Sequence, residues 1–516
     1  MEAQRPIPWR KAAGAASARP VLVEREPMLK QMAKFALVAS VLTLVACGGG
    51  TSPFTNRFGG GTGKLVVLVG DQPVCDVSSF RMTVTGVALV PQSGGSSVSV
   101  LSSAQPVTID LASLMDVSAL LSLNNVPAGT YSQITFTLAN PQLTSVDYTQ
   151  NPPAPATLAV TLPSLTVTYD INPALTVTAN GTAGLQIDFD LRNSIVTDTQ
   201  GNVTGDANLV ASVKPLSPVA GTGFGVIENL HGLVQSVSTT ASGSFTGSVV
   251  VQTTGLAGTN RTVNLTSSTV LNGLTSDLAS LLPQTFVEIN AYVDSSGNIV
   301  ATRLTAEEID QEALQHAGFL GQITSVTRLA SGDISEFTMI VQEEYPDVSA
   351  AVPLQASAQV VVLPSAVFYV AAPEDNTAQL ALGPATVGIG QEVTVHGNYL
   401  AGQRGVPAVV NATSIYLREQ TVEGNFSSLL AAGQDGKTGG FKFTPCSGVF
   451  QGQTISVLTF SGTEFENVTD LNSLTTTPTL LVHGELFYEP TLASSGTVTL
   501  TPPSNVLVSG KVHQLP

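Results

Sequence analysis

The chain has 516 residues, a net charge of −17, and only 11% charged residues against 43% hydrophobic residues. That length exceeds one typical domain, and the scarcity of Glu, Lys and Arg excludes a helical bundle, whose exposed faces need them. Nucleic acid is excluded as a partner, because the 20 basic residues form no stripe that could displace counterions from phosphates. The composition instead favours short strands joined by turns.

The first informative segment is a basic stretch followed by a short apolar run. Lys30 and Lys34 precede the largely apolar residues 35–46. The run is too short to span a bilayer, which needs about 20 residues, but it has the length of a secretory signal. We therefore interpret residues 28–46 as a signal peptide and residues 1–27 as an over-extended start.

The signal ends in Leu44-Val45-Ala46-Cys47, which resembles the lipobox of bacterial lipoproteins. The resemblance implies that Cys47 receives a diacylglyceryl group and becomes the first residue of the mature, exported protein. Residues 47–61 then form a Gly-rich tether, and Gly48 favours the outer membrane of the cell envelope. The alternative is an ordinary signal peptide that happens to contain a cysteine.

Two further cysteines follow Cys47. Cys75 and Cys446 stand 371 residues apart (446 − 75), and the chain has no C-x-x-C motif that would indicate a zinc knuckle or a redox pair. In an exported chain they could bridge separate domains. We interpret them as two isolated thiols, and we expect no metal and no cofactor.

Alternating, β-branched segments across residues 62–222 predict a β-sandwich. The most distinctive motifs are, in chain order, Asp71-Gln72-Pro73, Val84-Thr85-Gly86-Val87, Ile109-Asp110-Leu111, residues 127–134, residues 187–191 and Val213-Lys214-Pro215. In this order they resemble domain-of-unknown-function family 4382. The resemblance implies a prealbumin-like sandwich found in bacterial lipoproteins, with no established chemistry.

Beyond the sandwich, the chain repeats. Alternating strands at residues 287–293, 393–399 and 480–486 recur at domain-sized intervals, and a period this long indicates tandem domains rather than a solenoid. We place the repeats at residues 229–306, 317–422 and 438–516, with linkers at 307–315 and 423–440.

The repeats share an alternating strand that ends near a glycine, then a turn and a second strand. This pattern resembles domain-of-unknown-function family 5666, and the resemblance implies small closed barrels of the OB type. The sequence thus predicts an all-β protein, in which an N-terminal prealbumin-like β-sandwich precedes three small OB-like β-barrel repeats.

Histidines provide one candidate site. His396 and His483 occupy matching positions in successive repeats, on the strand face opposite the core valines. They could form a metal or ligand site reused in each barrel, but we expect solvent-facing positions. His231 and His316 precede the repeat openings, where we expect linkers.

Carboxylates provide another candidate site. Asp188 and Asp190 alternate with apolar residues, so both face one side of a strand and could act as an acid/base pair. We expect exposed polar positions instead, and residues 294–298 are more typical of a hairpin turn than of a calcium loop. The sequence contains no nucleophile elbow, zincin motif or phosphate-binding glycine loop. No catalytic residue is therefore predicted.

These features predict an exported, lipid-anchored envelope protein with a binding or structural role and no enzymatic activity. Its partners would be the membrane, through the anchor, and an envelope polysaccharide or protein. The alternative is an envelope enzyme that acts on glycans through paired carboxylates. A glycan binder would need an aromatic platform, for which Tyr292 and Tyr399 are the candidates because they occupy matching repeat positions.

Overall fold

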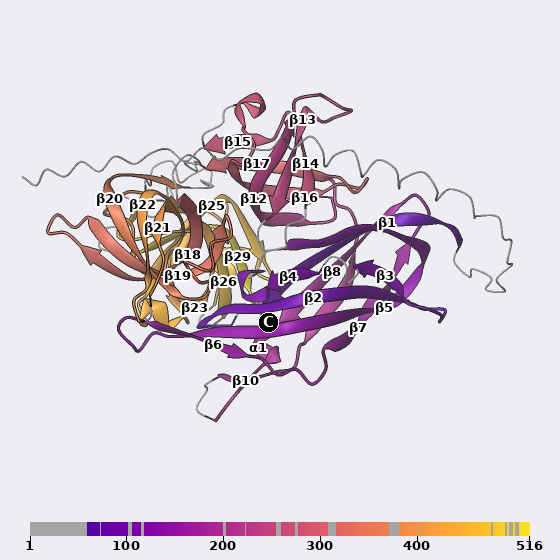
Figure 1. Cartoon of the computed structure of the whole chain (residues 1–516), viewed down its shortest axis with the longest axis horizontal. Coiled ribbons are helices and arrows are strands. Elements are labelled where there is room, and N and C mark those ends of the chain that lie inside the picture. Colours follow the sequence, from indigo (N-terminus) through magenta and orange to yellow (C-terminus); the bar gives the residue numbers. More distant parts are fainter. Residues whose placement is uncertain are drawn as a thin grey trace, which may run out of the picture. The chain divides into compact units, whose positions relative to one another are not determined.

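The structure confirms an all-β protein (Figure 1). It is a computed structural model, and it describes residues 59–72, 74–101, 106–114, 118–199, 203–221, 223–253, 260–273, 277–307, 316–370, 380, 382–403, 405–475, 478–490, 493–494, 499–500 and 505–515. All of them belong to the unit Phe58–Pro516. Cys47, the predicted signal peptide and most of the predicted tether lie outside the described residues. No helix in the described part of the chain is long and apolar enough to cross a membrane.

The N-terminal sandwich comprises strands joined by short turns. Its elements are β1 (Gly59–Gln72), β2 (Val77–Pro91), β3 (Val98–Leu101), β4 (Val107–Asp110), the 3₁₀ turn Leu111–Leu114, β5 (Ala119–Asp147), β6 (Ala154–Ala159), β7 (Thr166–Val177), β8 (Thr182–Asp190), α1 (Leu191–Ser194), β9 (Ile195–Thr197), β10 (Val203–Ala207) and β11 (Ala211–Leu216).

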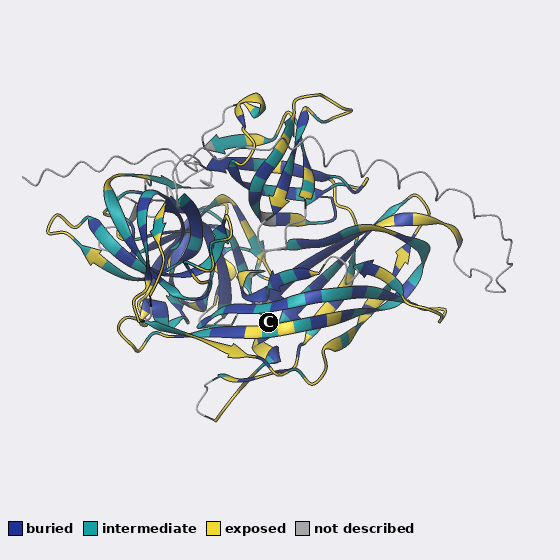
Figure 2. Cartoon of the chain, in the orientation of Figure 1, coloured by how far each residue is buried: buried dark blue, intermediate teal, exposed yellow. Residues whose placement is uncertain are grey.

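The long strand β5 belongs to both layers of the sandwich. Residues 119–128 pair with β1, and residues 129–147 pair with β2, β6 and β7. Buried positions alternate with more exposed ones along β2, as period-two strands require (Figure 2). Phe80, Phe136 and Phe189, from different strands, meet in one apolar core. This core is why the alternating segments fold as a sandwich.

The first barrel follows the sandwich. Its elements are β12 (Val226–Ser238), β13 (Gly247–Thr253), β14 (Asn260–Leu265), β15 (Val270–Gly273), the 3₁₀ turn Leu278–Ser280, β16 (Phe286–Val293) and β17 (Ile299–Glu307). A parallel pairing of Val263 with Ile299 joins β14 to β17 and closes the ring. Val66 and Leu68 of β1 enter the core of this barrel, so the sandwich and the first barrel share apolar contacts.

The second and third barrels repeat the same ring order. The second contains β18 (His316–Arg328), β19 (Ile334–Tyr345), β20 (Ser357–Val370), β21 (Glu392–Leu400) and β22 (Ala408–Leu417). The third contains β23 (Glu419–Ala432), β24 (Gly439–Pro445), the 3₁₀ turn Gly448–Phe450, β25 (Ile455–Glu466), the 3₁₀ turn Leu471–Ser473, β26 (Thr479–Phe487) and β29 (Val506–Gln514), beside the small pair β27 (Ala493–Ser494) and β28 (Thr499–Leu500).

In each closed ring the third strand pairs in parallel with the last strand, and the remaining pairings are antiparallel. This common topology confirms the prediction of OB-like barrel repeats.

The third barrel begins earlier than the sequence predicted. Its first strand starts at Glu419, whereas the prediction began the repeat at residue 438 and placed a linker at 423–440. The glycines that suggested a linker belong to the β23–β24 hairpin, where Gly433 N–H donates to Thr438 O at 2.6 Å. A Gly-rich hairpin turn and a Gly-rich linker have the same composition, so the sequence pattern could not separate them.

A disulfide between Cys75 and Cys446 joins the sandwich to the third barrel. The prediction of isolated thiols was therefore wrong. Beside the disulfide, Asp76 Oδ1 accepts hydrogen bonds from Gly448 N–H at 2.7 Å and from Ser447 Oγ at 3.0 Å. Cys75 and Cys446 meet because the chain, after the first two barrels, comes back to the sandwich in the third. No local sequence pattern indicates this long-range contact.

Reduction of this disulfide should lower the thermal stability of the protein. A covalent link across 371 residues restricts the unfolded chain, which corresponds to about 2–5 kcal/mol. Calorimetry with and without reductant measures the shift in melting temperature. Cys75→Ser should melt like the reduced wild type, and Cys47→Ser should retain the sensitivity to reductant. Equal melting temperatures for the oxidised and reduced wild type would contradict the prediction.

Candidate functional site

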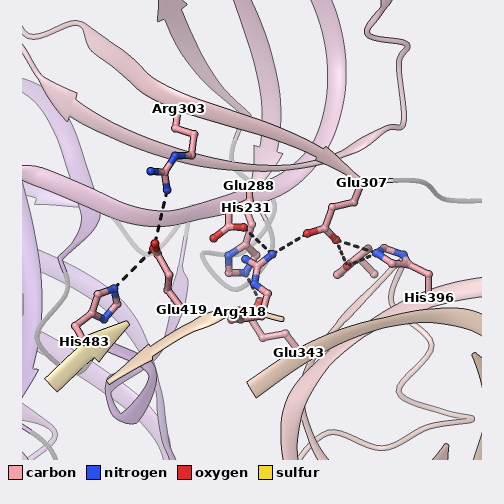
Figure 3. A network of polar contacts seen from close by, with 10 residues as sticks. His231, Glu288, Arg303, Glu307, Glu343, His396, Arg418, Glu419 and His483 are labelled. Carbon is pink, nitrogen blue, oxygen red and sulfur yellow. Dashed lines mark hydrogen bonds and ion pairs between the residues drawn. The ribbon is translucent and has the colours of Figure 1, made fainter. Parts of the chain in front are cut away.

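Arg418 connects the second barrel to the third and is buried against the first. It stands between β22 and β23, and 4% of its side chain is exposed. Its Nη1 lies 2.8 Å from Glu288 Oε2 in β16 and 2.7 Å from Glu307 Oε1 at the end of β17 (Figure 3). One guanidinium thus holds the junction of the later barrels against the first.

Glu307 extends this network into the second barrel. His396 Nε2 lies 2.8 Å from Glu307 Oε2, and the Tyr345 hydroxyl donates to the same oxygen at 3.4 Å. The Tyr345 ring stacks on Phe286 of the first barrel, with 3.6 Å between ring centroids. The carboxylate of Glu307 is therefore fully enclosed by charged, polar and aromatic partners.

The histidines do not lie where the sequence predicted. His396 is 0% exposed and His483 is 7% exposed, so neither faces solvent. The predicted strand alternation is correct, since Val393 and Val395 fill the barrel core. The opposite face is buried too, because another part of the protein packs on it, and alternation within one strand cannot reveal this.

The predicted linker positions of the other two histidines are also wrong. His231 lies in β12 and His316 is the first residue of β18. The His231 imidazole forms a hydrogen bond with the Glu343 carboxylate of the second barrel. His231 is therefore a second polar link between the first and second barrels.

The network has distinct pKa shifts. Burial lowers the pKa of Arg418, but the Glu288 and Glu307 carboxylates outweigh it and keep the guanidinium charged. Burial raises the pKa of Glu307, but the His396 hydrogen bond and Arg418 bring it below its ordinary value. For Glu288 burial prevails, and its pKa is raised. Arg418 thus favours the ionised form of both acids, and burial opposes it at each of them.

A cavity of about 560 Å³ lies beside this network, within the size range of small-molecule sites. Every barrel and the sandwich contribute to its lining. The sandwich supplies the apolar side chains Val69, Ile109, Ala112, Leu114, Ala119 and Leu121, together with the polar or charged side chains Ser78, Arg81, Thr108, Asp110 and Ser113. The carboxylates among the described lining residues are Asp110, Glu343, Glu344, Asp347, Glu392 and Glu419, and the basic groups are Arg81, His231, Arg418 and His483.

Three of these carboxylates have strongly raised pKa values. Burial raises the pKa of Asp110 to about 6, although the Ser79 hydroxyl and the Phe80 N–H donate to it. Burial also raises the pKa of Glu392 and of Glu344 to about 7. The cavity therefore contains acids that exchange protons near neutral pH, a property that clusters at functional sites.

Asp188 and Asp190 are not brought to this cavity. Both lie in β8, and neither is a lining residue. Asp190 caps α1, where its Oδ1 accepts the Asn193 N–H at 3.0 Å. The segment around Asp294 forms the predicted hairpin turn, with Asp294 Oδ1 accepting the N–H groups of Ser296 and Asn298.

The aromatic candidates also lie outside the cavity lining. Tyr399 packs edge-on against Phe319, with 6.1 Å between the ring centroids. Tyr292 lies near the end of β16, and neither tyrosine lines the cavity. In the described part of the chain, the one convergent group of potential metal ligands is Cys75, Cys446 and Glu423. Its two cysteines are bonded to each other.

Sequence reasoning missed the acids and the arginine that form the network. One signal was present: in a chain with 11% charged residues, Arg418 and Glu419 follow the apolar strand end Ile415-Tyr416-Leu417 directly. Charged residues placed within apolar strands indicate buried ion pairs. Their partners could not be read from the pattern, because Glu288 and Glu307 lie more than a hundred residues earlier.

Comparison with known proteins supports the N-terminal resemblance. Residues 62–204 match the family model described as "Domain of unknown function (DUF4382)". No curated protein matches the chain. The solved structures that match include Drosophila Unr CSD456, at 11% identity over 56% of this chain and 97% of that chain, with a TM-score of 0.13. A TM-score this low carries no argument about function.

Replacing Arg418 should destabilise the protein strongly. Arg418→Met leaves Glu288 and Glu307 buried without their cation, which costs about 3–5 kcal/mol. The control is Lys511→Met: Lys511 Nζ lies 3.1 Å from Glu466 Oε2, and Glu466 is 46% exposed, so the loss of this pair should cost less than about 1 kcal/mol. Urea unfolding followed by circular dichroism compares the two. Similar losses for both variants would contradict the central role of Arg418.

Proposed function

We propose that this protein is an exported, lipid-anchored protein of the bacterial cell envelope that binds a small ligand in its central cavity. The cavity of about 560 Å³, walled by the sandwich and every barrel, is the observation that carries the binding role. A purely structural spacer needs no cavity of this size lined by acids whose pKa values lie near neutral pH. The envelope polysaccharide or protein expected from the sequence remains a partner for the outer surface.

Two features support export. The segment from Lys30 to Cys47 has the order of a lipoprotein signal, and disulfides such as Cys75–Cys446 persist in oxidising compartments. The resemblance of the barrels to domain-of-unknown-function family 5666 and of the sandwich to family 4382 agrees with a lipoprotein. Attachment through several acyl chains on Cys47 would give firm anchoring, with the outer membrane as the preferred site.

Removing the acylated cysteine should release the protein from membranes. Cys47→Ser lacks the thiol that would carry the lipid, so the protein should lose incorporated palmitate and leave the detergent-extracted membrane fraction. Gly48→Ala keeps the cysteine and should stay with the membrane. Retention of Cys47→Ser in the membrane fraction would contradict the proposed anchor.

The binding role is tested by filling the cavity. Ala119 is a half-buried lining residue at the start of β5, and Ala119→Trp should occupy part of the cavity. Native mass spectrometry of the membrane-extracted protein should detect a co-purifying small molecule in the wild type but not in this variant. Ala156→Trp, at an exposed strand position in β6, is the matched control. An identical spectrum for the wild type and Ala119→Trp would overturn the binding role of the cavity.

A further inference from the structure

The cavity presents walls of different chemistry. Val69 and Leu121 belong to the apolar part of the sandwich lining, which also includes Arg81 and Asp110, whereas Glu392 and Glu419 belong to the barrels. A ligand that satisfies both walls needs an apolar body and a group complementary to carboxylates. The hydrogen-bond partners and the charge of Glu392 and Glu419 determine which polar group of a ligand they would accept.

Glu419 is buried, which raises the pKa of its carboxyl, but His483, Arg303 and Arg418 outweigh burial and bring that pKa below its ordinary value. Glu419 is 6% exposed, and among the described residues its nearest basic atoms are Arg303 Nη1 at 3.6 Å and His483 Nε2 at 3.8 Å. Both basic atoms thus lie within ion-pair distance of the carboxylate. A carboxylate can accept several hydrogen bonds, so Glu419 retains lone pairs for a further donor placed in the cavity.

Glu392 lies against the same segment of the chain. The Arg418 N–H donates to Glu392 O at 3.0 Å, and the Glu392 N–H donates to Gln420 Oε1 at 2.8 Å. Glu392 and Glu419 thus belong to adjoining parts of one wall. Within the described residues, the Glu392 carboxylate has no hydrogen-bond partner and lines the cavity.

Two other ligand classes fit this wall poorly. A bare metal ion needs donor atoms that converge on one point, and no cavity carboxylates form such a group in the described part of the chain. An anionic ligand would need a cationic side chain to bind it, but Arg418 is already paired with Glu288 and Glu307. The other guanidinium in the lining, Arg81, faces the charge of Asp110 and Glu343. His231 is paired with Glu343, and His483 lies beside Glu419.

We propose that the cavity binds an amphipathic organic cation, a protonated amine on an apolar body, with the ammonium group received by Glu392 and Glu419 and the body placed on the sandwich wall. This inference rests on the proposed binding function and names its ligand class. An ammonium group donates hydrogen bonds that the Glu392 carboxylate lacks and that Glu419 can accept in addition to its present contacts, and its charge offsets part of the cost of burying these carboxylates.

The affinity should depend on pH through Glu392. Its pKa of about 7 results from burial, with the charges of Arg418, Glu343, His483 and His231 facing it. A cation favours the ionised carboxylate, so binding should tighten as the pH rises through that value. Between pH 6 and pH 8 the ionised fraction, and with it the affinity, should rise about 10-fold. His231, whose pKa is also raised, loses its positive charge as the pH rises and acts in the same direction.

Calorimetric titration of the full chain with octylamine, octanol and octanoate tests the charge requirement at constant chain length. Octylamine should bind at one site, about 10-fold or more tighter than either analogue. Glu392→Gln and Glu419→Gln should each weaken octylamine binding, whereas Glu464→Gln, at an exposed position of β25, should not. The pH dependence of the wild type provides a test that requires no variant.

The outcomes separate this inference from the function on which it rests. If octanol or octanoate binds as tightly as octylamine and Ala119→Trp abolishes that binding, the proposed preference for a cation is wrong, but the cavity is still a binding site. The proposed cationic ligand is also wrong if octylamine does not bind, or if Glu464→Gln and Glu392→Gln lose the same amount of octylamine affinity. The binding function itself fails only by its own test, an Ala119→Trp variant with the same co-purifying mass as the wild type.

Discussion

The burial of one guanidinium determines how the barrels fit together. Arg418 loses its hydration at the barrel junction, and this loss is offset only if Glu288 and Glu307 of the first barrel stand within contact of Nη1. Apolar contacts between two surfaces are not directional, so one surface can shift along the other at little cost. A buried charge is stabilised only where its partners lie within contact distance. The ion pairs therefore favour an arrangement of the barrels in which both carboxylates reach Nη1 of Arg418.

The aromatic and histidine partners extend this constraint. The Phe286–Tyr345 stack lies between the first and second barrels, and His396 and Tyr345 both reach Glu307. Each partner satisfies part of a carboxylate that is 0% exposed. Because these contacts come from different barrels, the cost of an unsatisfied buried acid is avoided only in the assembled protein.

The cavity is a consequence of this assembly. Small closed barrels are rounded bodies that do not fill the space where they meet the sandwich, and Arg418, which forms the ion pairs, also lines that space. The acids there are partly removed from water, which is why the pKa values of Glu392 and Asp110 are raised. The disulfide between Cys75 and Cys446 links the sandwich and the third barrel beside this region.

The sequence by itself determined the all-β class, the sandwich of residues 62–222 and the tandem barrels, because strand alternation, turn residues and domain-length periods are local properties. It did not determine that Cys75 pairs with Cys446, that β23 begins at Glu419, or that the outer face of the His396 strand is covered. These features depend on contacts between residues far apart in the chain. Alternation divides a strand into two faces, but it does not show which other part of the protein packs on the second face. Only the tertiary structure decides that packing, and the packing brings Arg418 and the cavity acids together.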